Sequence, residues 1–212
     1  MHFLIGVVVA AACGLAAWLT SRLTTRSIAI LAVPFLVVVV AGVAFGLPLY
    51  PASDLFVGAV SILGGVALGR AMPPRFRTFL ILLAIFSVLD VAQNIAFSGP
   101  SPSGPTTNST PDPHLIWLNV RLSLPTGHFN IGFADLVLIA AATENLRRRG
   151  AGMALSLLPG VIGISLGEAL LATLPPNPPA VVDGIAASLV LFLTAGYVLT
   201  ELAVSQTATK TA

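Results

Sequence analysis

Residues 28–48 read IAILAVPFLVVVVAGVAFGLP, an apolar stretch without a charged side chain. A helix needs about 20 such residues to cross the hydrocarbon core of a bilayer. The rest of the chain is similar, because 56% of its 212 residues are hydrophobic, 8% are charged and the mean hydropathy is +0.97. Soluble domains carry about 25% charged residues. The composition therefore excludes a soluble globular protein, a disordered chain and a nucleic-acid-binding protein, and it predicts an all-α polytopic membrane protein.

Apolar stretches of comparable length recur along the sequence, and we predict seven transmembrane helices, since backbone groups that face lipid must be paired within helices. The predicted spans are residues 2–20, 28–48, 55–72, 76–97, 128–146, 151–174 and 180–203. They make a single domain over residues 1–212, with an N-terminal three-span part (1–75) and a four-span part (76–203). The third span contains Gly58, Gly64, Gly65 and Gly69, which favours close packing against another helix.

The basic residues predict the orientation. Nine of the ten fall in alternate loops: Arg22, Arg26, Arg70, Arg75, Arg77, Arg147, Arg148, Arg149 and Lys210. Arg121 alone lies on the other side. Cytoplasmic loops carry the excess of Lys and Arg, so we expect the N-terminus outside and the C-terminus in the cytoplasm.

The long outer loop before the fifth span has two parts. Residues 98–114 are rich in Pro, Ser, Thr and Gly, a composition typical of a flexible linker. Within residues 117–124, apolar and polar side chains alternate from Val120 to Leu124, which is the period of a strand with one apolar face. A short strand and a short interfacial helix or ordered loop both remain open for this part.

Two acidic residues, Asp90 and Asp135, lie well inside predicted spans. Each is seven residues from the outer end of its span, so both are expected about 10 Å below the outer boundary at 1.5 Å per residue. Charged groups are costly inside a bilayer, and they usually face a partner or a functional site. Two carboxyl groups at one level would share a proton. Such a pair can activate water and polarise a carbonyl group; it can also carry protons for transport, or join helices structurally.

The sequence around these aspartates resembles the presenilin and signal peptide peptidase family of intramembrane aspartyl proteases. Ile131-Gly132-Phe133-Ala134-Asp135 is similar to the family's GxGD motif, and Leu89-Asp90 stands where the family has Tyr-Asp. Leu174-Pro175-Pro176-Asn177 occupies the place of the Pro-Ala-Leu turn before the last helix. The resemblance covers roughly residues 76–203, and it suggests a short, diverged, prokaryotic-like member in a bacterial or archaeal cell membrane.

The resemblance implies roles for individual residues. Asp90 and Asp135 would be catalytic, and the substrate would be held by a strand just before the GxGD-like motif. The residues that would bind substrate or shape the active site are Leu89, Gly132, Phe133, Ala134, Pro175, Pro176 and Asn177. Three positions depart from the family pattern: Leu89 replaces Tyr, Ala134 replaces the second Gly, and Pro176-Asn177 replaces Ala-Leu.

The resemblance further implies an endopeptidase that cleaves single-span membrane segments or signal-peptide remnants. Its partners would be the transmembrane substrate and the lipid bilayer, without nucleic acid. No cofactor is expected, because His2, His114 and His128 lack metal-ligand spacing with acidic residues and the chain has one cysteine. The alternatives are a proton-coupled small transporter that uses the same carboxyl groups, and an inactive relative that binds membrane helices.

Overall fold

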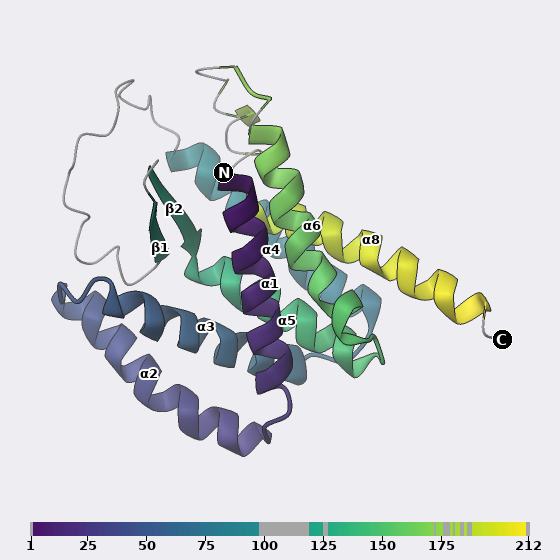
Figure 1. The fold of residues 1–212 in the computed structure, drawn as a ribbon, viewed down its shortest axis with the longest axis horizontal. Coiled ribbons are helices and arrows are strands. Elements are labelled where there is room, and N and C mark those ends of the chain that lie inside the picture. Colours follow the sequence, from purple (N-terminus) through teal and green to yellow (C-terminus); the bar gives the residue numbers. More distant parts are fainter. Residues whose placement is uncertain are drawn as a thin grey trace.

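The computed structural model describes residues 2–97, 119–124, 127–171, 173–175, 179, 181–182, 185 and 188–210. These residues form a predominantly helical bundle with one two-stranded hairpin (Figure 1). The elements are α1 His2–Thr20, α2 Thr25–Phe45, α3 Ala52–Ala71, α4 Phe76–Phe97, β1 Asn119–Leu124, β2 Gly127–Gly132, α5 Phe133–Arg148, α6 Met153–Leu171 and α8 Leu189–Lys210.

Three of the described helices are long and apolar enough to cross a membrane: Thr25–Phe45, Ala52–Ala71 and Phe76–Ile95. Three shorter apolar helical segments accompany them: Gly6–Thr20, Met153–Gly167 and Leu189–Val204. Helix α2 begins and ends at recognisable capping residues. For α2, the Thr24 side chain accepts the Ser27 N–H at 3.1 Å, and Gly46 closes the helix with φ of 59°.

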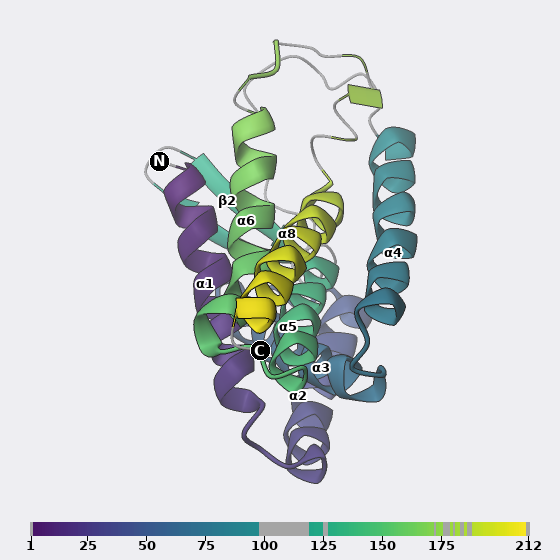
Figure 2. The same cartoon turned by 90° about the vertical axis from the view of Figure 1, so that its right-hand side faces the viewer.

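Helix α5 is the centre of the bundle and contacts α1, α3, α6 and α8 (Figure 2). Its residues Leu138–Leu146 are buried without interruption. The closest approach is to α3, where a Cβ at Gly65 would overlap the Val137 carbonyl oxygen and a Cβ at Gly69 would lie 2.8 Å from the Ala141 carbonyl oxygen. The close helix packing predicted from the small residues of the third span is confirmed at these two glycines.

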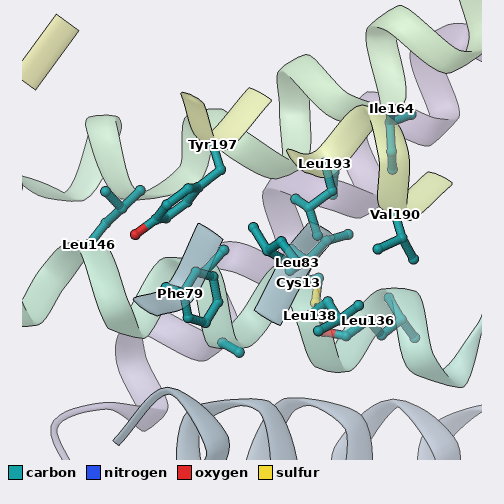
Figure 3. Close-up of a cluster of buried hydrophobic side chains, with 14 of the residues drawn as sticks. Cys13, Phe79, Leu83, Leu136, Leu138, Leu146, Ile164, Val190, Leu193 and Tyr197 are labelled. Atoms are coloured by element: carbon teal, nitrogen blue, oxygen red, sulfur yellow. Dashed lines mark hydrogen bonds between the residues drawn. The ribbon is translucent and has the colours of Figure 1, made fainter. Parts of the chain in front are cut away.

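A cluster of apolar side chains joins α5 to α4, α6 and α8 (Figure 3). Tyr197 of α8 is fully buried there, with its ring stacked on Phe76 at a centroid distance of 5.7 Å and tilted against Phe79 at 5.0 Å. Aromatic pairs at such separations add about 0.5–1.5 kcal/mol beyond the area that they bury. Helices α4 and α8 are thereby fixed on the same side of the core.

Two predicted span boundaries are wrong. The fifth span was predicted over 128–146, but residues 127–132 form β2, which pairs antiparallel with β1 in a register that sets Val120 opposite Ile131. Alternation of Phe129 and Ile131 with polar residues suits a strand better than a helix. The last span was predicted over 180–203, but Ser188 is not helical and α8 begins at Leu189.

Candidate functional site

Asp135 lies in the first turn of α5, not seven residues inside a helix. Gly132 is the N-cap residue, with φ of −66° and ψ of 149°, and its backbone N–H donates to Asp135 Oδ2 at 3.1 Å. A carboxylate three residues after the N-cap pairs an N–H group that the helix leaves free, and it also faces the positive end of the helix dipole. The side chain is half-buried. Asp135 therefore caps its own helix while it remains accessible.

Asp90 lies on α4 and is held by the beginning of α8. The Ser188 hydroxyl donates to Asp90 Oδ2 at 2.7 Å and accepts the Leu191 N–H at 3.3 Å. Ser188 is fully buried and Asp90 is half-buried. A second polar contact lies in the seam between α4 and α8, where the Ser87 and Thr194 hydroxyl groups lie 2.8 Å apart. The Ser188 contact, and not the Ser87–Thr194 contact, fixes the direction of the Asp90 carboxyl group.

The charge of Asp90 contributes to the electrostatic environment of the Asp135 carboxyl group, after the larger effect of burial. The helices that carry the two aspartates have little direct contact, because α4 packs mainly on α8 and contacts α5 at few positions. Neighbouring carboxyl groups resist joint ionisation and titrate as a pair. Carboxyl groups that lie close enough to share a proton can act together as an acid and a base, or pass a proton on.

The other predicted site residues are arranged less compactly. Leu89 and Ala134 are exposed, and Gly132 and Phe133 are half-buried. Phe133 packs against the apolar cluster of Val39, Val57 and Val60, so its role in the described structure is packing.

The predicted proline turn is only partly described. Pro175 is exposed, and Pro176 and Asn177 lie outside the described residues. The residue before α8 that does contact Asp90 is Ser188, which sequence reasoning missed. A signal was present, because Ser188 directly precedes the apolar run from Leu189, and Ser before such a run is a common N-cap.

A second cluster of polar residues lies at the C-terminal ends of α1, α3 and α5, where α5 carries its arginines. The buried Glu144 carboxylate accepts hydrogen bonds from Arg70 at 3.1 Å and from Arg147 at 2.7 Å. Arg149 pairs with Glu201, and this hydrogen bond raises the pKa of the Arg149 guanidinium above its ordinary value. Glu144 is thereby paired with the arginine cluster at the C-terminal end of α5.

Arginine side chains at this end also satisfy the carbonyl groups that helices leave free at their C-termini. Arg148 Nη1 donates to the carbonyl oxygens of Gly69, Arg70 and Met72 at 2.7–2.9 Å. Arg70 Nη2 donates to the Ser21 and Leu23 carbonyl oxygens, at 2.6 Å and 2.8 Å. These bonds tie the ends of α1, α3 and α5 together, which is a structural task.

A cavity of about 360 Å³ lies between α1, α3, β1 and α5. Its lining is apolar apart from the edge formed by Asp54: Val8, Val9, Ala12, Cys13, Ala16, Asp54, Gly58, Ile62, Val120 and Leu136. Neither Asp90 nor Asp135 lines it. The cavity and the aspartate pair are therefore separate features of the bundle.

No protein-family model, curated protein or solved structure matches this chain.

Proposed function

We propose that the chain is an intramembrane aspartyl endopeptidase whose acid and base are Asp90 and Asp135. The observation that carries the proposal is the presence of two half-buried carboxyl groups, one on α4 and one on α5, each fixed by a hydrogen bond to its Oδ2. Charged groups inside a bilayer are costly and mark functional sites by default. The family resemblance of the surrounding residues supports proteolysis over the other uses of such a pair.

In the proposed mechanism, the ionised carboxylate takes a proton from a water molecule as that water attacks the scissile carbonyl carbon. The protonated carboxyl group donates a hydrogen bond to the carbonyl oxygen and stabilises the charge that develops there. The proton is then passed to the leaving amide nitrogen. Asp135 is suited to a fixed position in this chemistry, since the Gly132 N–H holds its Oδ2.

The substrate in this proposal is a single transmembrane segment that is locally extended at the cleaved bond. Within the described sheet, β1 pairs only with β2, so the other edge of β1 carries backbone groups that no described strand uses. Extended peptides bind proteins by adding a strand to such an edge. β2 leads directly into α5, and so brings a peptide bound at the hairpin toward Asp135.

The proposed membrane arrangement has seven spans with the N-terminus outside. The charge bias of the loops supports it, as does the gathering of Arg70, Arg147, Arg148 and Arg149 at one end of the bundle. The loop between α4 and α5 then faces outside. Substrates would have their N-termini in the cytoplasm, as type II membrane proteins and remnant signal peptides do.

The test is cleavage of a single-span peptide of this orientation in reconstituted vesicles. Asp90→Asn and Asp135→Asn should each abolish cleavage. Asp135→Asn keeps an oxygen that can accept the Gly132 N–H, so the helix cap is retained and lost activity reports the ionisable group. Asp54→Asn, which removes an acidic residue outside the pair, is the control and should cleave as the unmodified protein does.

Two outcomes would overturn the proposal. Cleavage at the unmodified rate by both Asn variants would remove the aspartates from the mechanism. Proton-coupled uptake of a solute, lost in both variants and accompanied by no peptide cleavage in the unmodified protein, would assign the pair to transport.

A further inference from the structure

Ser188 has a hydroxyl group with two partners on different elements. It donates to Asp90 Oδ2 on α4 at 2.7 Å and accepts the Leu191 N–H in the first turn of α8 at 3.3 Å. A hydroxyl group has one proton to donate. Because that proton points to Asp90 while a lone pair faces Leu191, the orientation of the group is set from both sides.

We infer that Ser188 is a positioning residue for Asp90, an inference that rests on the proposed function. A hydrogen bond to a carboxylate is stronger than one between neutral groups, and Ser188 is fully buried, so water cannot replace it. The bond occupies Oδ2 and thereby leaves Oδ1 as the oxygen that can take a proton from water. Ser188 holds Asp90 by a hydrogen bond between two different elements. Gly132, in contrast, holds Asp135 at the start of the same helix.

The alternative is that Ser188 only caps α8 and fastens it to α4. The chain provides a matched comparison for this alternative, because Ser87 and Thr194 join the same two helices by hydroxyl groups 2.8 Å apart. Among the described residues, neither of these hydroxyl groups is bonded to a carboxylate. Each also lies 2.8 Å from a carbonyl oxygen of its own helix, and because each has one proton, one hydroxyl group donates to the other while the second donates to its carbonyl oxygen. Loss of the Thr194 hydroxyl therefore loosens the seam and leaves the Asp90 contact in place.

The experiment measures kcat and KM for peptide cleavage by Ser188→Gly, Ser188→Thr and Thr194→Val. Glycine serves as an N-cap within a few tenths of a kcal/mol of Ser, so Ser188→Gly removes the Asp90 contact and largely keeps the helix end. We expect its kcat to fall roughly ten- to hundred-fold, as loss of one hydrogen bond to a charged group implies. KM should stay within about two-fold, because the fully buried hydroxyl group is not exposed to a bound peptide. Ser188→Thr retains a hydroxyl group that can donate to Asp90, so its kcat should stay near that of the unmodified protein.

Thr194→Val should leave kcat unchanged, even where it lowers the temperature of unfolding. A fall of kcat in Thr194→Val equal to that in Ser188→Gly would overturn the inference, because it would show that kcat depends on the packing of α8 against α4 and not on the Asp90 contact. Unchanged kcat in Ser188→Gly, together with abolished cleavage in Asp90→Asn, would also overturn it while the proposed function stands. If Asp90→Asn itself cleaves normally, the proposed function has failed and the positioning role with it.

Discussion

Glu144 and Arg70 form an ion pair between helices that are distant in the sequence. The Glu144 carboxylate is fully buried, and its Oε1 accepts the Arg70 Nε–H at 3.1 Å, while Arg147 donates to the same carboxylate from the next turn of α5. A single carboxylate thus pairs with two guanidinium groups. The pair fixes the end of α3 on α5, near the glycine contacts of Gly65 and Gly69.

Replacing the buried acid should destabilise the protein strongly. Glu144→Ala leaves Arg70 and Arg147, which are 17% and 32% exposed, without their shared partner, so we expect a loss near the lower end of the about 3–5 kcal/mol that removal of one member of a buried ion pair costs. Thermal unfolding in detergent micelles measures the effect. Glu201→Ala is the matched control and should cost less, because Glu201 is 18% exposed and pairs with one arginine, whereas Glu144 is fully buried and pairs with two. Equal losses in the two variants would contradict this reading of Glu144.

The glycine contact between α3 and α5 should not tolerate even a methyl group. In Gly65→Ala the new Cβ would overlap the Val137 carbonyl oxygen and lie 2.5 Å from the Ala140 Cβ, so we expect a loss of about 1–3 kcal/mol. Gly64→Ala tests the same helix at the next residue, where a Cβ meets nothing within 4 Å. That variant should be neutral or gain about 0.5–1 kcal/mol from the better helix former. Unfolding temperatures of the two variants check the difference.

The buried tyrosine of α8 should contribute through its hydroxyl group as well as its ring. Tyr197 Oη donates to Asn145 Oδ1 at 2.8 Å, and Asn145 Nδ2 donates to the Pro73 carbonyl oxygen at 3.4 Å. Tyr197→Phe keeps the ring stacking and leaves Asn145 Oδ1 unpaired, at an expected cost of about 1–3 kcal/mol. Combining it with Asn145→Ala should give a non-additive result, because both changes remove the same bond. Strict additivity would show that the bond contributes nothing.

Reporter fusions test the orientation. A reporter fused after Lys210 should be read in the cytoplasm, and one inserted within residues 98–114 should be read outside, because the basic residues gather in the opposite loops. An extracytoplasmic reading at Lys210 would reverse the proposed orientation and the class of substrate.

The apolar helices could be predicted from composition and length alone, because an uncharged run such as residues 28–48 must be helical to pair its backbone groups in lipid. The beginning of α5 did not. The apolar residues Phe129, Ile131 and Phe133 are compatible with a strand or with the start of a helix, and pairing of residues 127–132 with β1 decides between the two. A span drawn by hydropathy therefore extends over the hairpin, and Asp135 was expected deeper in a helix than it lies.

The aspartate pair stays a prediction. Sequence order placed Asp90 and Asp135 on consecutive helices, and they lie on α4 and α5. The support of Asp90 could not be deduced in the same way, because Ser188 is ninety-eight positions away and its role depends on where α8 begins. The Glu144–Arg70 pair is similar: the nearby arginines of α5 were evident, and the partner from α3 required the tertiary packing.

The junction of β2 and α5 has a mechanical consequence. Gly132 is at once the last residue of the strand and the N-cap of the helix, and its N–H is bonded to Asp135. No linker residue is present to absorb a twist. The backbone torsions of Gly132 therefore set the tilt of the hairpin against the first turn of α5, and with it the direction in which Asp135 points.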